Sequence, residues 1–137
     1  MTVSTTTTIK VLQPLGWAAP KGYANGVAAS GTQIFVAGQI GWNAQQQFES
    51  DDLVVQVRQA LANIVTVLAE AGAKPAHIVR MTWYLTDKRE YLMRAREIGS
   101  AYRELIGSYT VAMSAVQVAA LIEDRALVEI EVTAVVP

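Results

Sequence analysis

The segment from Met113 to Val136 constrains the fold most, because it carries two glutamates inside what otherwise reads as a buried apolar strand. Side chains alternate along a strand, so Glu129 and Glu131 share one face and lie roughly 7 Å apart. The other face is entirely apolar: Val128, Ile130, Val132, Ala134 and Val136. Burying an ionised carboxylate without partners is costly. We therefore expect the glutamates to meet hydrogen-bond donors, a neighbouring subunit, or water in a cleft.

Length and composition predict a single domain over residues 1–137 that assembles with copies of itself. A chain of this length buries about two-thirds of the surface that its unfolded form exposes. It has 52% hydrophobic and 17% charged residues, which is more apolar side chain than a small monomer easily hides. We expect a homo-oligomer.

Charge and the N-terminal segment exclude other classes. The net charge is −1 and the basic residues are scattered, which argues against a nucleic-acid partner. The first ten residues have no apolar core of the signal-peptide type, and no run of 18 apolar residues predicts a membrane span. We expect a cytoplasmic protein without a membrane partner.

The residue types also argue against metal and serine-hydrolase chemistry. The chain has no cysteine, and its one histidine, His77, cannot supply a typical zinc ligand set. A G-x-S-x-G motif is absent from the sequence, and His77 lies far along the chain from Ser114. No metal site is predicted.

Hydrophobic periodicity predicts an α+β fold. Ser50, Asp51 and Asp52 provide an N-cap and favourable charge for the first helix, which ends at Gly72. The pattern predicts strands at 9–12, 26–29, 32–40, 78–87, about 109–119 and 126–136, and helices from 53 and from about 91 to 107. The strands at 26–29 and 32–40 are predicted to form a hairpin through Ser30 and Gly31.

Both helices are expected on one face of the sheet. We expect the other face to be mostly aliphatic and covered by a second subunit. Gly38 interrupts its strand, which indicates a bulge or a close approach by another group.

Four sequence motifs carry a resemblance to a known family. They are VAGQI at 36–40, MTWYLTD at 81–87 followed by a helix, SAVQVAAL at 114–121 and LVEIEVTAV at 127–135. Together they resemble the Rid/YjgF family of enamine and imine deaminases, over roughly Gly22 to Val136. The resemblance implies a chorismate-mutase-like fold, a homotrimer with a central barrel, and clefts between subunits. It implies hydrolysis of enamines or imines without a metal or an organic cofactor.

The resemblance also assigns site residues. Glu129 matches the glutamate that holds a water in the cleft, and Tyr23 matches a loop tyrosine. Gly38 matches the glycine of an SGQ-like motif. Ser114 follows the position of the arginine that binds the substrate carboxylate, and that position is Met113 in this chain. Ala115 replaces a common cysteine.

The replacement at Met113 predicts a different substrate. A bidentate arginine makes two strong hydrogen bonds, and its loss lowers affinity for a small imino acid at least about tenfold. Methionine is apolar and polarisable, so Met113, with Trp42 or Trp17 nearby, would suit a bulkier, aromatic or esterified molecule. The competing interpretation is that Met113 only fills a degenerate pocket.

The leading functional hypothesis is hydrolytic deamination of an enamine, an imine or a related aminated unsaturated metabolite, possible examples being aminomuconate-like compounds. In it Glu129 places the water, and backbone groups near Gly38 and Ala115 polarise the substrate. Arg89 is a candidate replacement cation, with a solvated surface arginine as the alternative. The rival hypothesis is a non-catalytic trimer that binds a small molecule or a partner.

Overall fold

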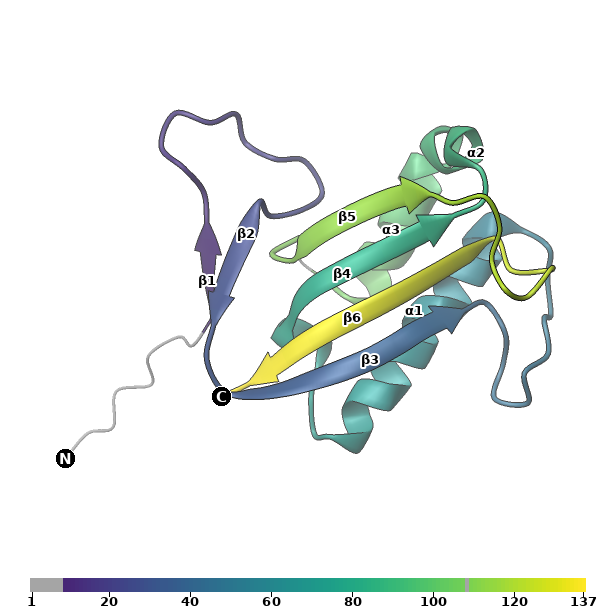
Figure 1. The fold of residues 1–137 in the computed structure, drawn as a ribbon, viewed down its shortest axis with the longest axis horizontal. Helices are drawn as coiled ribbons and strands as arrows, with labels where there is room; N and C mark the ends of the chain where they lie inside the picture. Colours follow the sequence, from purple (N-terminus) through teal and green to yellow (C-terminus); the bar gives the residue numbers. More distant parts are fainter. Residues whose placement is uncertain (1–8, 108) are drawn as a thin grey trace.

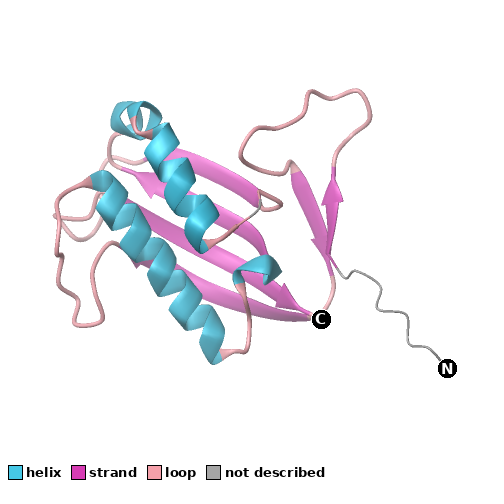
Figure 2. Ribbon diagram, turned by 180° about the vertical axis from the view of Figure 1, so that it is seen from behind, coloured by secondary structure: helices cyan, strands magenta, loops and turns pink. Residues whose placement is uncertain are grey.

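The computed structural model describes residues 9–107 and 109–137. A four-stranded mixed sheet carries two long helices on one face, and a separate two-stranded hairpin lies beside it (Figures 1 and 2). The strands are β1 (Ile9–Leu12), β2 (Gly26–Ala29), β3 (Thr32–Ile40), β4 (Ile78–Leu85), β5 (Ala112–Gln117) and β6 (Val128–Val136). The helices are α1 (Leu53–Glu70), α2 (Lys88–Met93) and α3 (Ala95–Leu105), with a short 3-10 turn at Pro75–His77. The predicted α+β class is confirmed.

The last strand lies inside the sheet. The strand order is β3-β6-β4-β5, in which β6 runs antiparallel to both of its neighbours and β4 runs parallel to β5. Along β6, Val128, Ile130, Val132 and Ala134 are buried against the helices, as the alternation predicted. Glu129 and Glu131 are half-buried on the opposite face.

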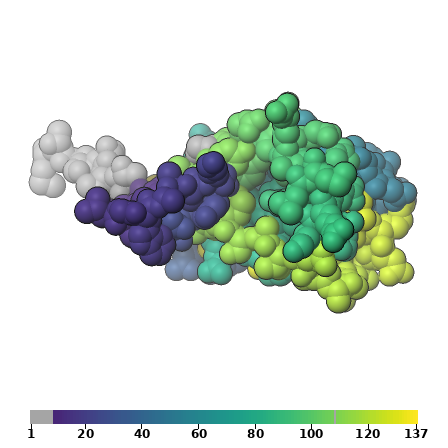
Figure 3. Space-filling model, turned by 90° about the horizontal axis from the view of Figure 1, so that it is seen from above, coloured from purple at the N-terminus to yellow at the C-terminus, as the bar shows by residue number. Residues whose placement is uncertain are grey.

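The predicted hairpin between residues 26–29 and 32–40 is wrong. β2 pairs with β1, in the register Ile9 to Ala29, and β3 pairs with β6 instead. The hairpin of β1 and β2 projects from one end of the molecule and is shown in purple in Figure 3. Ala24 joins it to the body by a backbone hydrogen bond of 2.8 Å to the carbonyl of Val111. A short turn such as Ser30-Gly31 fixes a change of direction, but not which strand the chain then pairs with.

The second predicted helix is two helices. α2 ends at Met93 and α3 begins at Ala95, with Arg94 between them at φ −100° and ψ 15°. Tyr91 and Ile98 still face the same interior space across the break. The apolar period therefore continues through the junction, which explains why the sequence pattern predicted one helix.

The uncovered face of the sheet is mostly polar, with a few exposed apolar side chains, rather than mostly aliphatic. Registered neighbours on this face include Tyr84 beside Glu129 and Thr82 beside both Glu131 and Ser114. Phe35 on β3 is 71% exposed there, beside Thr133. The expected aliphatic composition is therefore wrong, because only the face toward the helices follows the apolar alternation.

Helix α1 is an amphipathic core helix. It is long and apolar enough, by length and composition alone, to cross a membrane. Eight of its residues, however, are buried against the rest of the domain, among them Val57, Leu61, Ile64 and Leu68. A core helix of a folded domain passes the same length and composition test.

Asp52 fixes the start of α1, and its charge should contribute to stability. Its side chain accepts a hydrogen bond from Val55 N at 3.1 Å, and Arg94 Nη1 lies 3.0 Å from its Oδ1. The Arg94 hydrogen bond, followed by that of Val55, lowers the pKa of Asp52 below its ordinary value of 3.8. A carboxyl with a lowered folded-state pKa contributes its stability above the unfolded value. The contribution is lost as the pH falls through the folded pKa.

We expect Asp52→Asn to lower the free energy of unfolding by about 0.5 to 1 kcal/mol at pH 7, because asparagine caps as well but leaves Arg94 without this anion. The difference from the natural protein should shrink as the pH falls below 3.8. Urea unfolding at several pH values measures it. Asp124→Asn, at an exposed carboxylate without an ion pair among the described residues, is the control. A difference that stays constant with pH would contradict the role of the charge.

Candidate functional site

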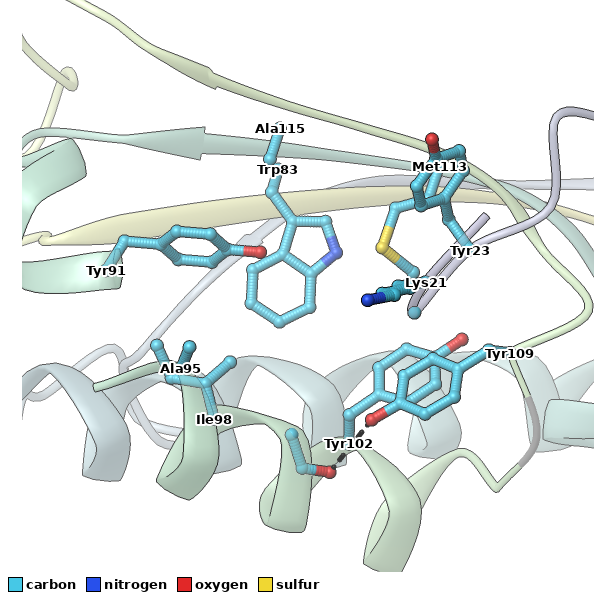
Figure 4. A pocket seen from close by; sticks show the side chains of 12 residues that line it. Lys21, Tyr23, Trp83, Tyr91, Ala95, Ile98, Tyr102, Tyr109, Met113 and Ala115 are labelled. Atoms are coloured by element: carbon cyan, nitrogen blue, oxygen red, sulfur yellow. Dashed lines mark hydrogen bonds between the residues drawn. The ribbon is translucent and has the colours of Figure 1, made fainter. Parts of the chain in front are cut away.

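A cavity of about 530 Å³ lies between the edge of the sheet and the α2–α3 layer (Figure 4). The β1–β2 loop closes one side of it. Its walls come from the strands (Trp83, Met113 and Ala115), the helices (Tyr91, Ala95, Ile98, Gly99 and Tyr102) and the loops (Lys21, Gly22, Tyr23 and Tyr109). The volume suits a metabolite with an aromatic ring.

Aromatic rings form most of the wall. Tyr102 and Tyr109 stack with their centroids 4.8 Å apart and their planes 5° apart. Trp83 meets Tyr91 edge to face, with centroids 6.1 Å apart. Burial raises the pKa of both Tyr91 and Tyr102 above 10, so these hydroxyls stay neutral near pH 7. The aromatic wall offers flat, uncharged contact surfaces rather than a general base.

Two nitrogen donors face this space. Trp83 is only 2% exposed, and its Nε1 has no hydrogen-bond partner among residues 9–107 and 109–137. In Figure 4 this nitrogen points to the side of the cavity where Met113 and Lys21 lie. The Lys21 side chain forms no ion pair or hydrogen bond with residues 9–107 and 109–137. Tyr109 is engaged instead, because its hydroxyl donates to the carbonyl of Gly99 at 3.3 Å.

Glu129 and Gly38 form a second cluster, on the opposite face of the sheet. A Cβ on Gly38 would lie 2.7 Å from Glu129 Cδ, so the carboxylate occupies the space that a side chain would fill. The pairing of β3 with β6 shifts register between Val36 and Gln39, which confirms the expected irregularity at Gly38. Glu131, two residues along, accepts a hydrogen bond of 2.7 Å from Tyr84 Oη. That bond raises the pKa of Tyr84.

The predicted site residues divide between these two clusters. Tyr23, Met113 and Ala115 line the cavity, whereas Gly38 and Glu129 touch each other across the sheet. Met113 is registered with Met81 on the helix side, and Tyr84 with Glu129 on the uncovered side. One chain alone therefore does not bring Met113 and Glu129 together.

The other predicted residues lie outside the cavity. Ser114 is exposed on the uncovered face, beside Thr82. Arg89 is exposed in the first turn of α2, where its backbone N–H donates to Asp87. The tryptophans expected near Met113 are elsewhere: Trp17 is 63% exposed on the β1–β2 loop and Trp42 packs against Phe48. Trp83 takes that place, because residue 83 shares the helix-facing side of β4 with Met81.

Several cavity residues escaped prediction from sequence. The periodicity had placed Trp83 on the apolar side of its strand and Tyr91 and Tyr102 on the apolar seam of the second helix, which is also what core residues do. Lys21 and Tyr109 gave no signal, because loop residues have no period. In the described parts of the chain, no group of three His, Asp or Glu side chains could hold a metal ion.

The fold and cavity define an α+β domain with a mixed sheet and a pocket between the sheet edge and the α2–α3 layer. A model of the family described as Endoribonuclease L-PSP matches residues 16–136. A RutC family protein from Synechocystis is 33% identical over 133 residues, covering 95% of this chain and 98% of that protein. The chain belongs to this family, which is the Rid/YjgF family that the sequence motifs resemble.

Two further proteins extend the comparison. A crystal structure of a protein of unknown function from the conserved Rid family of Yersinia pestis has 33% identity and a TM-score of 0.82. The similarity covers 95% of this chain and all of that one, 100%. A 2-iminobutanoate/2-iminopropanoate deaminase from Capra hircus is 33% identical over 103 residues, 74% of this chain and 72% of that protein.

Proposed function

We propose that this protein hydrolyses the C=N bond of an imine, or of an enamine after tautomerisation, to a carbonyl compound and ammonia. The observation that carries the proposal is the half-buried Glu129 carboxylate packed against the backbone of Gly38. The deaminase among the relatives supports this reaction class.

The proposed chemistry needs one water and no redox partner. Water adds to the imine carbon, and its proton reaches the nitrogen with help from the Glu129 carboxylate. The resulting carbinolamine then breaks its C–N bond, so that ammonia leaves and the C=O bond forms. Imine carbons are already electrophilic, so positioning the water contributes much of the rate.

We propose that the complete site forms between two chains. Glu129 and the aromatic cavity lie on opposite faces of one sheet, so a second copy must bring its Glu129 to the cavity of the first. In a cyclic homotrimer every chain would give a cavity to one site and a glutamate to another. The half-buried state of Glu129 supports this arrangement, because a neighbouring subunit could complete its surroundings.

A mixing experiment tests the shared site. Glu129→Gln removes the carboxylate that one chain gives to the site. Met113→Glu disables the cavity that the other chain gives, because it places a carboxylate inside it. Each variant alone should be inactive. Random exchange of equal amounts should restore about a quarter of the sites, because half of the glutamates and half of the cavities are intact. No recovery after subunit exchange, verified by mass spectrometry of the assemblies, would contradict a site shared between chains.

Gly38→Ala should reduce turnover without unfolding the protein. The added Cβ would lie 2.7 Å from the end of the flexible Glu129 side chain, which can move aside. We expect kcat to fall at least about tenfold, because a displaced carboxylate no longer positions the water. Thermal unfolding should show a Tm within a few degrees of the natural protein. An unchanged kcat would show that catalysis does not depend on the close contact between Glu129 and Gly38.

The second candidate is a binding protein without turnover, and Met113 favours it because the family's carboxylate-binding arginine is missing. Imines generated in situ by an amino acid oxidase from alanine or phenylalanine distinguish the two candidates. Ammonia or carbonyl release by the natural protein supports the enzyme. Release that appears only in Met113→Arg supports the binding protein. RNA serves as a control substrate because the family description contains the word endoribonuclease, and the net charge of −1 predicts weak RNA binding and no cleavage.

A further inference from the structure

We propose that Lys21 and the Trp83 indole N–H together receive the carboxylate of a substrate whose aromatic group lies against the tyrosines of the cavity. This inference rests on the proposed imine hydrolysis and names its substrate class: a 2-imino or 2-enamino acid with an aromatic side chain. The anionic anchor is thereby supplied by the β1–β2 loop and β4, in place of an arginine at Met113.

The buried indole nitrogen is the first observation. A tryptophan Nε1–H is a donor only, and buried donors in folded proteins nearly always have a partner. Trp83 is only 2% exposed, yet its Nε1 has no hydrogen-bond partner in the part of the chain that the structure describes. Trp83 lines a cavity large enough for a ligand, and its buried Nε1 points to the side of that cavity where Met113 and Lys21 lie (Figure 4). A ligand acceptor would satisfy it, and a charged carboxylate oxygen is the stronger acceptor.

The unpaired cation is the second observation. Lys21 lines the same cavity, and its ammonium forms no ion pair or hydrogen bond within the described residues. In Figure 4 the Lys21 nitrogen and the Trp83 nitrogen lie on the side of the cavity where Met113 lies. Among the described residues no other charged side chain lines the cavity, so an anion placed here meets the Lys21 cation and no carboxylate from them.

The aromatic walls select the rest of the substrate. The stacked pair of Tyr102 and Tyr109 presents a flat face, and Tyr91 closes the end beyond Trp83. A methyl or ethyl side chain would leave much of the roughly 530 Å³ unfilled, whereas a phenyl or indole ring would contact the tyrosines. Met113, apolar and polarisable, borders the same space and fits the ring edge.

Binding of a stable 2-oxo acid product and of two analogues tests this without requiring turnover. The probes are phenylpyruvate, its methyl ester and 2-oxobutanoate, measured by calorimetry with the intact protein. We expect phenylpyruvate to bind at least about tenfold more tightly than either other probe. Lys21→Met, which keeps the apolar stem, should weaken phenylpyruvate about five- to tenfold and leave the ester unchanged. Lys10→Met, at an exposed lysine of the same hairpin, is the matched control and should change nothing.

The indole contact has its own readout. The Trp83 indole N–H resonance should shift downfield on binding phenylpyruvate, and Trp83→Phe, which keeps a ring but loses the donor, should weaken that acid more than the ester. If Trp83→Phe does not fold, the resonance in the natural protein decides. Equal binding of acid and ester, a Lys21→Met variant that binds phenylpyruvate normally, an unmoved resonance, or tighter binding of 2-oxobutanoate would each overturn the proposal.

Failure of the two proposals can be distinguished. Charge-dependent binding of phenylpyruvate with no ammonia release from its imine would overturn the hydrolysis and leave the ligand class standing. Imine turnover with equal affinity for all probes would overturn the proposed ligand class and leave the hydrolysis standing. Added salt should weaken the acid in the natural protein but not in Lys21→Met, because screening acts on the Lys21 charge.

Discussion

Glu129→Gln should lower kcat for imine hydrolysis by about 10²- to 10⁴-fold, the range by which a positioned acid–base group accelerates proton transfer. Glutamine keeps the shape of the side chain beside Gly38 but cannot accept the proton of the attacking water. Affinity for a stable product analogue should change little, because the anchor that we propose, Lys21 with Trp83, lies in the cavity. Ammonia release under saturating imine, together with calorimetric binding, measures both quantities.

Glu131→Gln is the matched control for this prediction. It removes the same charge from the same face of β6, two residues away, where the carboxylate accepts a bond from Tyr84. We expect a much smaller fall in kcat than for Glu129→Gln. Equal losses in the two variants would show that the charge of the uncovered face matters rather than the carboxylate beside Gly38.

Gln56→Leu should lower the stability of the protein more than Asp52→Asn does. Gln56 is fully buried in α1, and its amide donates at 3.0 Å to the carbonyls of Ser50 and Arg125. Its Oε1 accepts from Leu127 N at 2.8 Å. Leucine would leave three backbone groups without partners, at a cost of about 3 kcal/mol in the free energy of unfolding.

Thermal and urea unfolding measure this loss, which corresponds to a fall of about 10 °C in Tm. Gln59→Leu is the control, because Gln59 is on the same helix and bonds one side chain, Asn63. The space around Gln56 is tight, since a Cβ on Gly41 would lie 2.7 Å from Gln56 Cα. A Tm within a few degrees of the natural protein would mean that water replaces the lost amide.

The hydrogen bonds of Gln56 also help to position Glu129 of the candidate site. Two of its three bonds hold the chain at Arg125 and Leu127, directly before β6 begins at Val128. The first residue of β6 that faces the uncovered side is Glu129. We therefore expect the site to lose its geometry when this connection is lost.

Much of the fold could be predicted because its signals are local. The alternation along β6 predicted which residues face the helices, and the apolar period predicted α1. Gly38 inside a strand also predicted a bulge or a close approach by another group, and in the structure the Glu129 side chain makes that approach. The pairing of strands was harder to predict from the sequence. β2 joins β1 rather than β3, because pairing depends on contacts between distant segments and the turn at Ser30 and Gly31 does not specify them.

The candidate site was predictable only in part. Motif positions brought forward Tyr23, Met113 and Ala115, which do share a cavity, and Gly38 and Glu129, which do touch. Nothing in the sequence separated a cavity tryptophan from a core tryptophan at residue 83. Lys21 lies in an irregular loop, where side-chain direction has no period to reveal it.

By itself, the sequence determined where most helices and strands lie and which residues share a face of β6. Strand and helix periods depend only on residues that are close together in the chain. Only the tertiary structure decided that Glu129 and the aromatic cavity lie on opposite sides of one sheet. It also decided that Lys21 and the Trp83 indole, neither of which has a polar partner among the described residues, lie at one cavity. Both facts follow from how distant strands and loops pack together, which local periodicity does not encode.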